Sequence, residues 1–287
     1  MKKHLPAQEL ARDRRFVRSD IVDQINDPRT ASRGGRRRGS QRLTPEVPDA
    51  PDRARALMHG IFVGELQALE GAGRTCFDFE VATSNDGSAA RTDEVPFELK
   101  LDMARQCWDE ARHCEISVKL GEWMGTEIGE FGEGVFLYQA ACAPDPVLRL
   151  TGVNRALEGL AIDVFNTMRE FAQVAGDPVL EFCEDWMLAD EVTHVKMGSN
   201  WLRRLTADDP DRREQALEFQ RTVDKLFSLG GFRGEEDDSP IRLARRFREL
   251  AGFDQQEIDE IAELSHEARR VFESRVQAAS TLAETTG

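Results

Sequence analysis

The chain lacks any apolar run of the length that a membrane-spanning helix requires, and its polar, arginine-rich beginning has no apolar stretch typical of a secretory signal. It also lacks a glycine-rich phosphate-binding loop and the motifs that surround a nucleophilic serine or cysteine. Its five cysteines form no C-x-x-C pair and leave an odd thiol, which argues against a disulfide framework. These absences predict a cytoplasmic protein without a membrane segment.

The composition predicts a largely helical globular protein. With 287 residues, of which 40% are hydrophobic, the chain can bury a sizeable core as one large domain or two small ones. The formal net charge is -15, although residues 1–53 are rich in arginine. Such an arm could bind nucleic acid, but an acidic body repels phosphate. We favour an arm that is partly disordered or wraps the body of its own chain or of a partner subunit.

The most informative pattern is the five-residue motif D-E-x-x-H, which occurs at 109–113 and again at 190–194. Residues three positions apart lie on one face of an α-helix, so each copy directs a carboxylate and an imidazole to the same point. Both copies interrupt apolar stripes, where an ionised carboxylate is strongly disfavoured without a cation or a full set of hydrogen bonds. The two motifs therefore predict half of a dinuclear metal site.

A carboxylate-rich dinuclear site in a four-helix bundle needs one further glutamate from each of two other helices. The predicted helix over 150–175 carries Glu158 on its apolar face. The predicted helix over 54–75 carries Glu65 on its apolar face, whereas Glu70 is turned about 140° away and is kept as an alternative. The predicted metal ligands are Glu65, Glu110, His113, Glu158, Glu191 and His194.

Two aspartates lie next to these ligands in the sequence. Asp109 and Asp190 each precede a ligand glutamate by one residue, about 100° around the helix. From there, each could bond the outward nitrogen of a ligand histidine on a neighbouring helix. The alternative is a surface or interhelical salt bridge, with Arg112 as one partner.

The order Glu, Glu-x-x-His, Glu, Glu-x-x-His resembles the ligand pattern of the ferritin-like di-iron carboxylate superfamily. Several local sequence segments are also similar to the family known as domain of unknown function 455, which is itself related to bacterial di-iron hydroxylases of modified tRNA bases. These segments are His59 with the run 65–70, Leu157-Glu158 with Asp163, the run 190–195, Arg245-Arg246 and the run 251–253. The likeness covers roughly 54–262 and leaves out the first fifty residues. The resemblance implies a ferritin-like fold, and it places Glu70 and Asp163 beside Asp109 and Asp190 as candidates for the shell around the ligands.

The predicted fold is all-α, a ferritin-like four-helix bundle with additional N- and C-terminal helices. Its parts are an arm over 1–53, the di-metal bundle over 54–206, and a helical extension over 207–287 packed on the bundle. Asp145-Pro146 and Asp177-Pro178 are predicted to begin the third and fourth core helices, because aspartate caps a helix and proline is tolerated in its first turn.

Carboxylate and imidazole ligands suit two iron ions, with manganese as the alternative, better than copper. We therefore expect an oxidoreductase of the monooxygenase or oxidase type, which uses O2 to oxidise a C–H or N–H bond of a small molecule. The expected partners are the small-molecule substrate, an electron donor and a second copy in a homodimer, without nucleic acid or membrane. The alternative is a metal-storage or structural protein, and hydroxylation of a tRNA base ranks below both.

Overall fold

The computed structural model describes residues 50–82, 94–131, 135–230, 233–235, 239, 241–264, 266, 267 and 270. The arginine-rich arm predicted over 1–53 therefore lies almost wholly outside the described residues. The described part is all-α apart from two pairs of two-residue parallel strands. None of its helices combines the length and the hydropathy that crossing a bilayer demands.

The elements follow one another along the chain in a simple order. The first half contains α4 (Ala50–Asp78), β1 (Glu80–Val81), β2 (Glu94–Val95), α5 (Phe97–Met124) and α6 (Phe136–Ala141). The second half contains α7 (Pro146–Leu150), the π-helix η2 (Thr151–Leu157), α8 (Glu158–Ala175), α9 (Pro178–Leu205), α10 (Pro210–Gly230), β3 (Arg233–Gly234), β4 (Ile241–Arg242) and α11 (Arg245–Leu250). Residues 255–264 are also helical.

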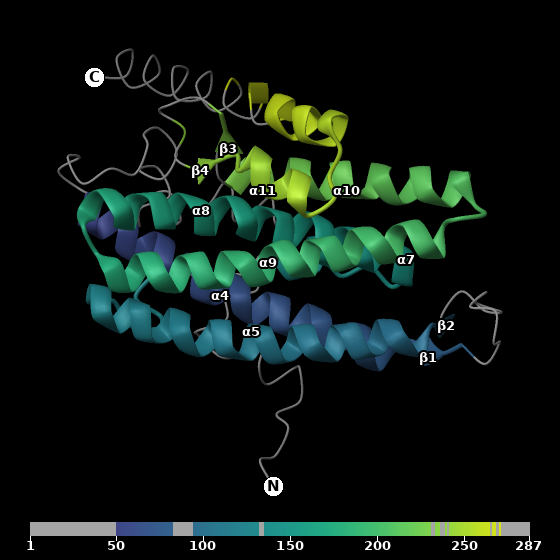
Figure 1. The fold of residues 1–287 in the computed structure, drawn as a ribbon, viewed down its shortest axis with the longest axis horizontal. Coiled ribbons are helices and arrows are strands. Elements are labelled where there is room, and N and C mark those ends of the chain that lie inside the picture. Colours follow the sequence, from purple (N-terminus) through teal and green to yellow (C-terminus); the bar gives the residue numbers. More distant parts are fainter. Residues whose placement is uncertain are drawn as a thin grey trace, which may run out of the picture.

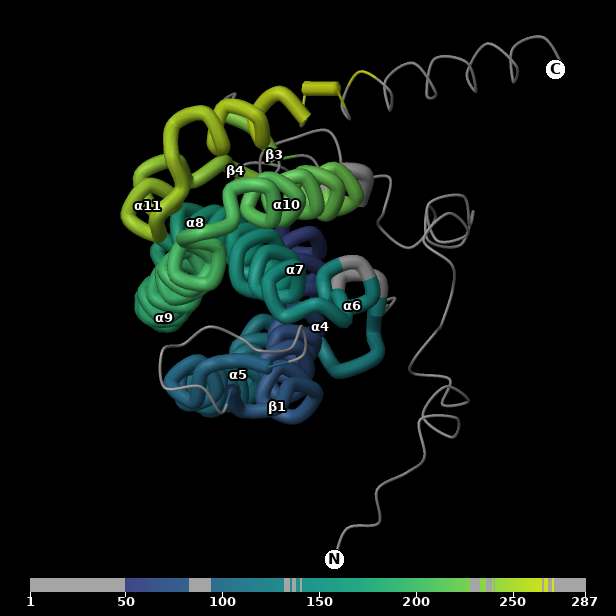
Figure 2. Tube along the Cα trace, turned by 90° about the vertical axis from the view of Figure 1, so that its right-hand side faces the viewer, coloured from purple at the N-terminus to yellow at the C-terminus, as the bar shows by residue number. Residues whose placement is uncertain are grey.

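The long helices pack as two pairs. Helix α4 lies along α5, and α8 lies along α9, while contacts between α5 and α9 and between α4 and α8 join the pairs (Figures 1 and 2). Apolar side chains from all four helices fill the space between them, because each helix turns one apolar face inward. This core includes Met58 and Ile61 of α4, Leu120 of α5, Ile162 and Phe165 of α8, and Met187 and Val195 of α9.

The helix starts predicted at Asp145 and Asp177 are confirmed. The carboxylate of Asp145 accepts hydrogen bonds from the backbone N–H groups of Val147 and Leu148, at 2.8 and 3.0 Å. Asp177 caps α9 in the same way. Each aspartate satisfies two of the N–H groups that have no partner within the helix, so it fixes the first turn.

The third long helix is not α-helical throughout. The sequence predicted one α-helix over 150–175, but residues Thr151–Leu157 form a π-helix between α7 and α8. A methyl group on Gly152 would lie 2.1 Å from the carbonyl oxygen of Ala141, and one on Gly198 would lie 2.5 Å from Cβ of Asn154. Glycine is thus required where α6 and α9 approach the π-helix. Such π-helical turns are rare and are frequent at functional sites, and this one ends directly before Glu158.

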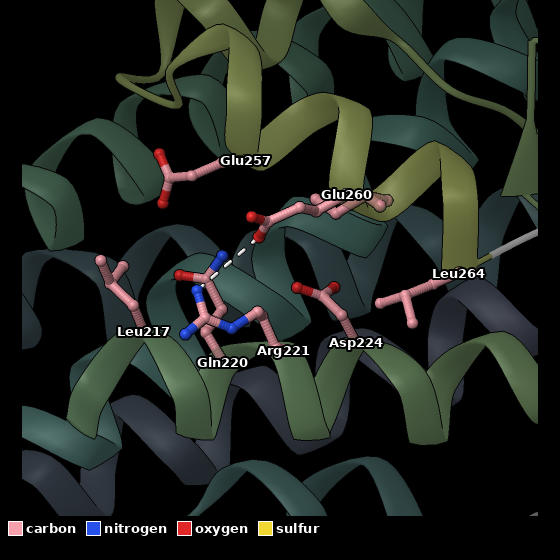
Figure 3. Close-up of a pocket in the computed structure, with 8 residues that line it drawn as sticks. Leu217, Gln220, Arg221, Asp224, Glu257, Glu260 and Leu264 are labelled. Atoms are coloured by element: carbon pink, nitrogen blue, oxygen red, sulfur yellow. Dashed lines mark ion pairs between the residues drawn. The ribbon is translucent and has the colours of Figure 1, made fainter. Parts of the chain in front are cut away.

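The C-terminal segments cover the outer side of α8 and the π-helix (Figures 1 and 2). Figure 3 shows α10 facing the helical residues 255–264, where Arg221 forms an ion pair with Glu260 at 3.7 Å. The space between these two helices is about 10 Å³, which is room for about one water molecule. This contact is therefore a packed interface rather than a ligand site.

Candidate metal centre

The six predicted ligands meet in the interior of the four long helices. Each is at most 3% exposed, and together they form two groups, within each of which the possible ligand atoms all lie within 4.8 Å of one another. Both groups contain Glu110 of α5 and Glu191 of α9. Group one adds Glu65 and His113, and group two adds Glu158 and His194. The arrangement has the form of two adjacent cation positions that share two glutamates.

The two histidines have equivalent surroundings. Nδ1 of His113 lies 3.0 Å from a carboxylate oxygen of Glu65 and 3.1 Å from one of Glu191. Nδ1 of His194 lies 3.1 Å from a carboxylate oxygen of Glu110. The ring centroids are 6.0 Å apart. Both rings thus direct the same nitrogen towards the shared glutamates, as expected when one motif occurs on two neighbouring helices.

The outward nitrogens contact the two aspartates of the motifs. Nε2 of His113 lies 3.2 Å from Asp190, and Nε2 of His194 lies 3.3 Å from Asp109. These are the contacts between neighbouring helices that the sequence indicated. Arg112 also bonds Asp109 and lies 3.4 Å from Asp190, so the salt-bridge alternative holds at the same time. A carboxylate at this nitrogen fixes the orientation of the ring and leaves Nδ1 free to bind a cation.

Two buried amide side chains that the sequence analysis missed, Gln106 and Asn154, form hydrogen bonds beside the second group of ligands. Gln106, with no exposed surface, donates through Nε2 to Glu110 at 3.1 Å and to Glu158 at 2.9 Å. Its oxygen accepts from Asn154 of the π-helix at 2.6 Å. Gln106 lies one helical turn before Glu110, a spacing that could have revealed it. Asn154 could not be found in this way, because the π-helix alters the helical phase.

Glu184 is a second residue that the sequence analysis missed. It lies on α9 two helical turns before Glu191, and it is completely buried. Neither of its carboxylate oxygens has a hydrogen-bond partner among the residues that the structure describes. Burial raises the pKa of Glu184 well above its usual range, and the charge of Glu65 adds to this effect. Glu184 is therefore a buried acidic group whose surroundings favour its uncharged form.

Two residues expected around the ligands lie elsewhere. Asp163 accepts hydrogen bonds from Arg248 at 2.6 Å and from the backbone N–H of Ala244 at 2.9 Å, so it joins α8 to the C-terminal segments. The reason is helical phase, since five residues after Glu158 correspond to about 140° of rotation. Glu70 is on the exposed side of α4 and belongs to neither group of ligands. The expectation that these two carboxylates surround the centre is thus corrected.

A cleft of about 380 Å³ lies beside the second group, between α5 and α9. Figure 1 shows these two helices running side by side. The lining of the cleft includes the buried side chains of Gln106 and His194 together with Met197 and Trp201. The volume is within the usual range for small-molecule sites in proteins. Space for a ligand therefore exists directly at a predicted metal-binding side chain.

Comparison with known proteins places the chain in a family. The family model described as "Protein of unknown function (DUF455)" matches residues 2–259. The chain belongs to this family. The match includes nearly all of the arm over 1–53. The similarity to the family therefore begins earlier in the chain than residue 54, where the sequence analysis placed its start. No curated protein and no solved structure matches the chain.

The donor set of this family member fits divalent cations. Among the described residues, one oxygen of Glu110, both oxygens of Glu191 and Nδ1 of His194 are buried without a hydrogen-bond partner. Buried polar atoms without partners are unusual because each costs free energy, whereas a cation would satisfy all of these atoms at once. Four carboxylates would also balance the charge of two divalent ions. The residues present therefore suit two adjacent ions with hard oxygen and imidazole ligands.

We expect metal affinity to increase as the pH rises. Burial raises the pKa of Glu65 and Glu158 well above the usual range, and the charges of Glu110 and Glu191 add to this. Burial thus favours the protonated forms of these two glutamates in the metal-free site, and a cation that binds them displaces their protons. Raising the pH lowers the cost of that displacement. Titration calorimetry in buffers of different ionisation enthalpy should show proton release, and an affinity independent of pH would contradict this expectation.

Glu65 should matter for metal binding and Glu70 should not. Glu65 belongs to one of the two groups, so Glu65→Ala should remove about one of the two ions or weaken its binding about tenfold or more. Glu70→Ala is the matched control on the same helix, and it should leave both ions in place. Metal content after gel filtration distinguishes the two variants. Equal losses would mean that α4 contributes a different ligand.

Proposed function

We propose that this protein is a non-haem di-iron oxidase or oxygenase that uses O2 to oxidise a C–H or N–H bond of a small molecule. We assign its two helix pairs to a ferritin-like four-helix bundle, because the chain order of the ligands and their positions on α4, α5, α8 and α9 follow that pattern. One observation carries the proposal: two buried groups of ligands share Glu110 and Glu191. Iron is the favoured metal, with manganese as the alternative.

Each part of the site has a defined task in this proposal. Glu110 and Glu191, which belong to both groups, would help to hold both ions, and the other four ligands would each help to hold one. A reduced iron pair would supply electrons to O2, and an external donor would return them. Trp186 and Phe165 pack edge-on against His113, with ring centroids 5.9 and 6.3 Å away. These aromatic rings keep water from that side of the centre.

A metal-storage protein is the competing function, and the cleft favours the enzyme. Storage requires a route for ions and a place where mineral accumulates, whereas oxidation of an organic molecule requires a pocket beside the metals. The cleft lined by Gln106 and His194 has the volume of such a pocket. Hydroxylation of a tRNA base ranks lower, since a chain with a net charge of -15 repels nucleic acid.

Oxygen consumption separates these functions. The protein is loaded with ferrous iron under nitrogen and then exposed to O2 in the presence of an electron donor and candidate substrates. An enzyme keeps two irons per chain, and its O2 uptake increases with an added substrate. The variant with Glu110→Ala and Glu191→Ala is the control without a centre. Iron uptake that continues far beyond two per chain, with formation of a ferric mineral, would contradict the enzyme and support storage.

A further inference from the structure

We infer that the cleft between α5 and α9 binds small organic oxyanions, in which a carboxylate or phosphate group is attached to an apolar body. The inference rests on the proposed function, because it assigns a substrate class to the same site. It draws on three features of the cleft: its cationic rim, its apolar wall and its contact with the metal ligands.

The rim of the cleft is cationic although the protein is acidic. Arg105 from α5 and Lys196 and Arg204 from α9 line it, and all three are exposed. Two carboxylates lie close by: Asp102 in the lining, and Asp109, 3.8 Å from Nε of Arg105. In a chain with a net charge of -15, three cations around one cleft create a local field that attracts anions.

The neighbouring carboxylates are already committed to other groups. Asp102 accepts a hydrogen bond from Nε1 of Trp201 at 2.7 Å. Asp109 bonds Arg112 and lies 3.3 Å from Nε2 of His194. Since each of these carboxylates faces another donor, the cations of the rim retain donors for a ligand. Guanidinium and ammonium groups form charge-assisted hydrogen bonds with carboxylates and phosphates.

One wall of the cleft is apolar. The ring of Trp201 and the side chain of Met197 contribute to the lining, and the guanidinium carbon of Arg204 lies 4.7 Å from the centroid of the Trp201 ring. Trp201 is held in place by its bond to Asp102 and by burial in the core. An apolar group of a ligand can therefore stack beside a cation that binds its charged end.

The inner part of the cleft meets the candidate centre. His194 and Gln106 are buried and belong to the same lining as the exposed cations. A ligand whose oxyanion is bound at the rim would thus direct its apolar body towards the second group of metal ligands. With two divalent ions bound, the four glutamates of the site are neutralised and do not repel an anion. The volume of about 380 Å³ suits a small molecule rather than a macromolecular chain.

Binding measured without turnover tests this inference separately from the proposed function. Full-length, metal-loaded protein under nitrogen is titrated with phenylacetate, phenyl phosphate and the neutral phenylacetamide, by calorimetry and tryptophan fluorescence. At least one anion should bind about tenfold more tightly than the amide, with an affinity that falls as salt is added. The two anionic probes distinguish a carboxylate from a phosphate preference.

Matched triple variants locate the binding. Arg105→Gln, Lys196→Gln and Arg204→Gln together should remove the preference for anions while metal content stays unchanged. The control combines Lys119→Gln, Arg213→Gln and Lys225→Gln, which makes the same change in charge at exposed positions outside the cleft and should keep the preference.

Four outcomes would overturn the inference. The first two are that the anions and the amide bind equally well, or that neither anion binds. The third is that the control variant loses the preference for anions as much as the cleft variant does. The fourth is that tRNA displaces phenylacetate at a lower concentration than phenyl phosphate does. None of these outcomes depends on O2, so an inactive protein that still prefers anions would contradict only the proposed function. Substrate-dependent O2 uptake with neutral compounds alone would contradict only this inference.

Discussion

Simultaneous replacement of Glu110 and Glu191 by alanine is expected to abolish metal binding. Both residues belong to both groups of ligands, so the variant leaves each position with one carboxylate and one imidazole. Circular dichroism checks that the variant folds, because it removes buried carboxylates that contact His113 and His194. Calorimetric titration with ferrous iron or manganese under nitrogen measures the loss. Wild-type protein should bind two ions per chain, and the variant should show no saturable binding.

The control for this variant uses glutamates on the outer faces of the same two helices. Glu115→Ala on α5 and Glu181→Ala on α9 remove the same number of carboxylates from an exposed and a partly exposed position, outside both groups of ligands. They should bind two ions with wild-type affinity. Undiminished binding by the Glu110 and Glu191 variant would show that these two residues do not bridge metal ions.

Metal loading should raise the stability of the wild-type protein strongly. Burial of carboxylates is unfavourable in the metal-free form, and a cation that binds only the folded chain stabilises it by mass action. With free metal about a thousandfold above its dissociation constant, the gain is about 4 kcal/mol. For a domain of this size that corresponds to an increase in Tm of roughly 10 °C. Differential scanning calorimetry with and without metal measures this difference.

Variants separate this effect from unspecific ion binding. The double variant of Glu110 and Glu191 should show no metal-dependent increase in Tm, because it cannot bind the ions. Glu115→Ala should show the full increase. The expectation is wrong if wild type shows no increase, or if the double variant shows the same increase as wild type.

Helical periodicity predicted the two Glu-x-x-His pairs, and together with the ligand pattern of four-helix bundles it indicated Glu65 and Glu158. Glu110 and His113, three residues apart, share a face of α5, and the repeat of the motif at Glu191 and His194 placed a second pair opposite. The same reasoning indicated that the adjacent aspartates would meet the outward histidine nitrogens. The position of each aspartate or histidine relative to its neighbouring glutamate is local within one helix and depends only on its regular rotation. The partner of each aspartate lies on the other helix.

Other features depend on contacts between distant segments. The π-helix before Glu158 follows from the close approach of α6 and α9 at Gly152 and Gly198, which no local pattern encodes. Asp163 was expected near the ligands, but Arg248 from the C-terminal part of the chain binds it instead. The cleft likewise arises from the spacing between α5 and α9.

Glu184 shows that a local signal was also overlooked. It precedes Glu191 by seven residues, so it occupies the same face of α9 two turns earlier. It is completely buried, it has no hydrogen-bond partner within the described part of the chain, and the charges of Glu65 and His113 act on it. A search of the stripe for every carboxylate, rather than for the family pattern alone, would have found it.

The stoichiometry of bound metal tests the central claim most directly. The protein is loaded with excess ferrous iron under nitrogen, separated from free metal by gel filtration, and analysed for metal and protein in the same fraction. The shared positions of Glu110 and Glu191 predict two ions per chain. A fully loaded protein that contains one ion per chain, or none, would contradict a dinuclear centre.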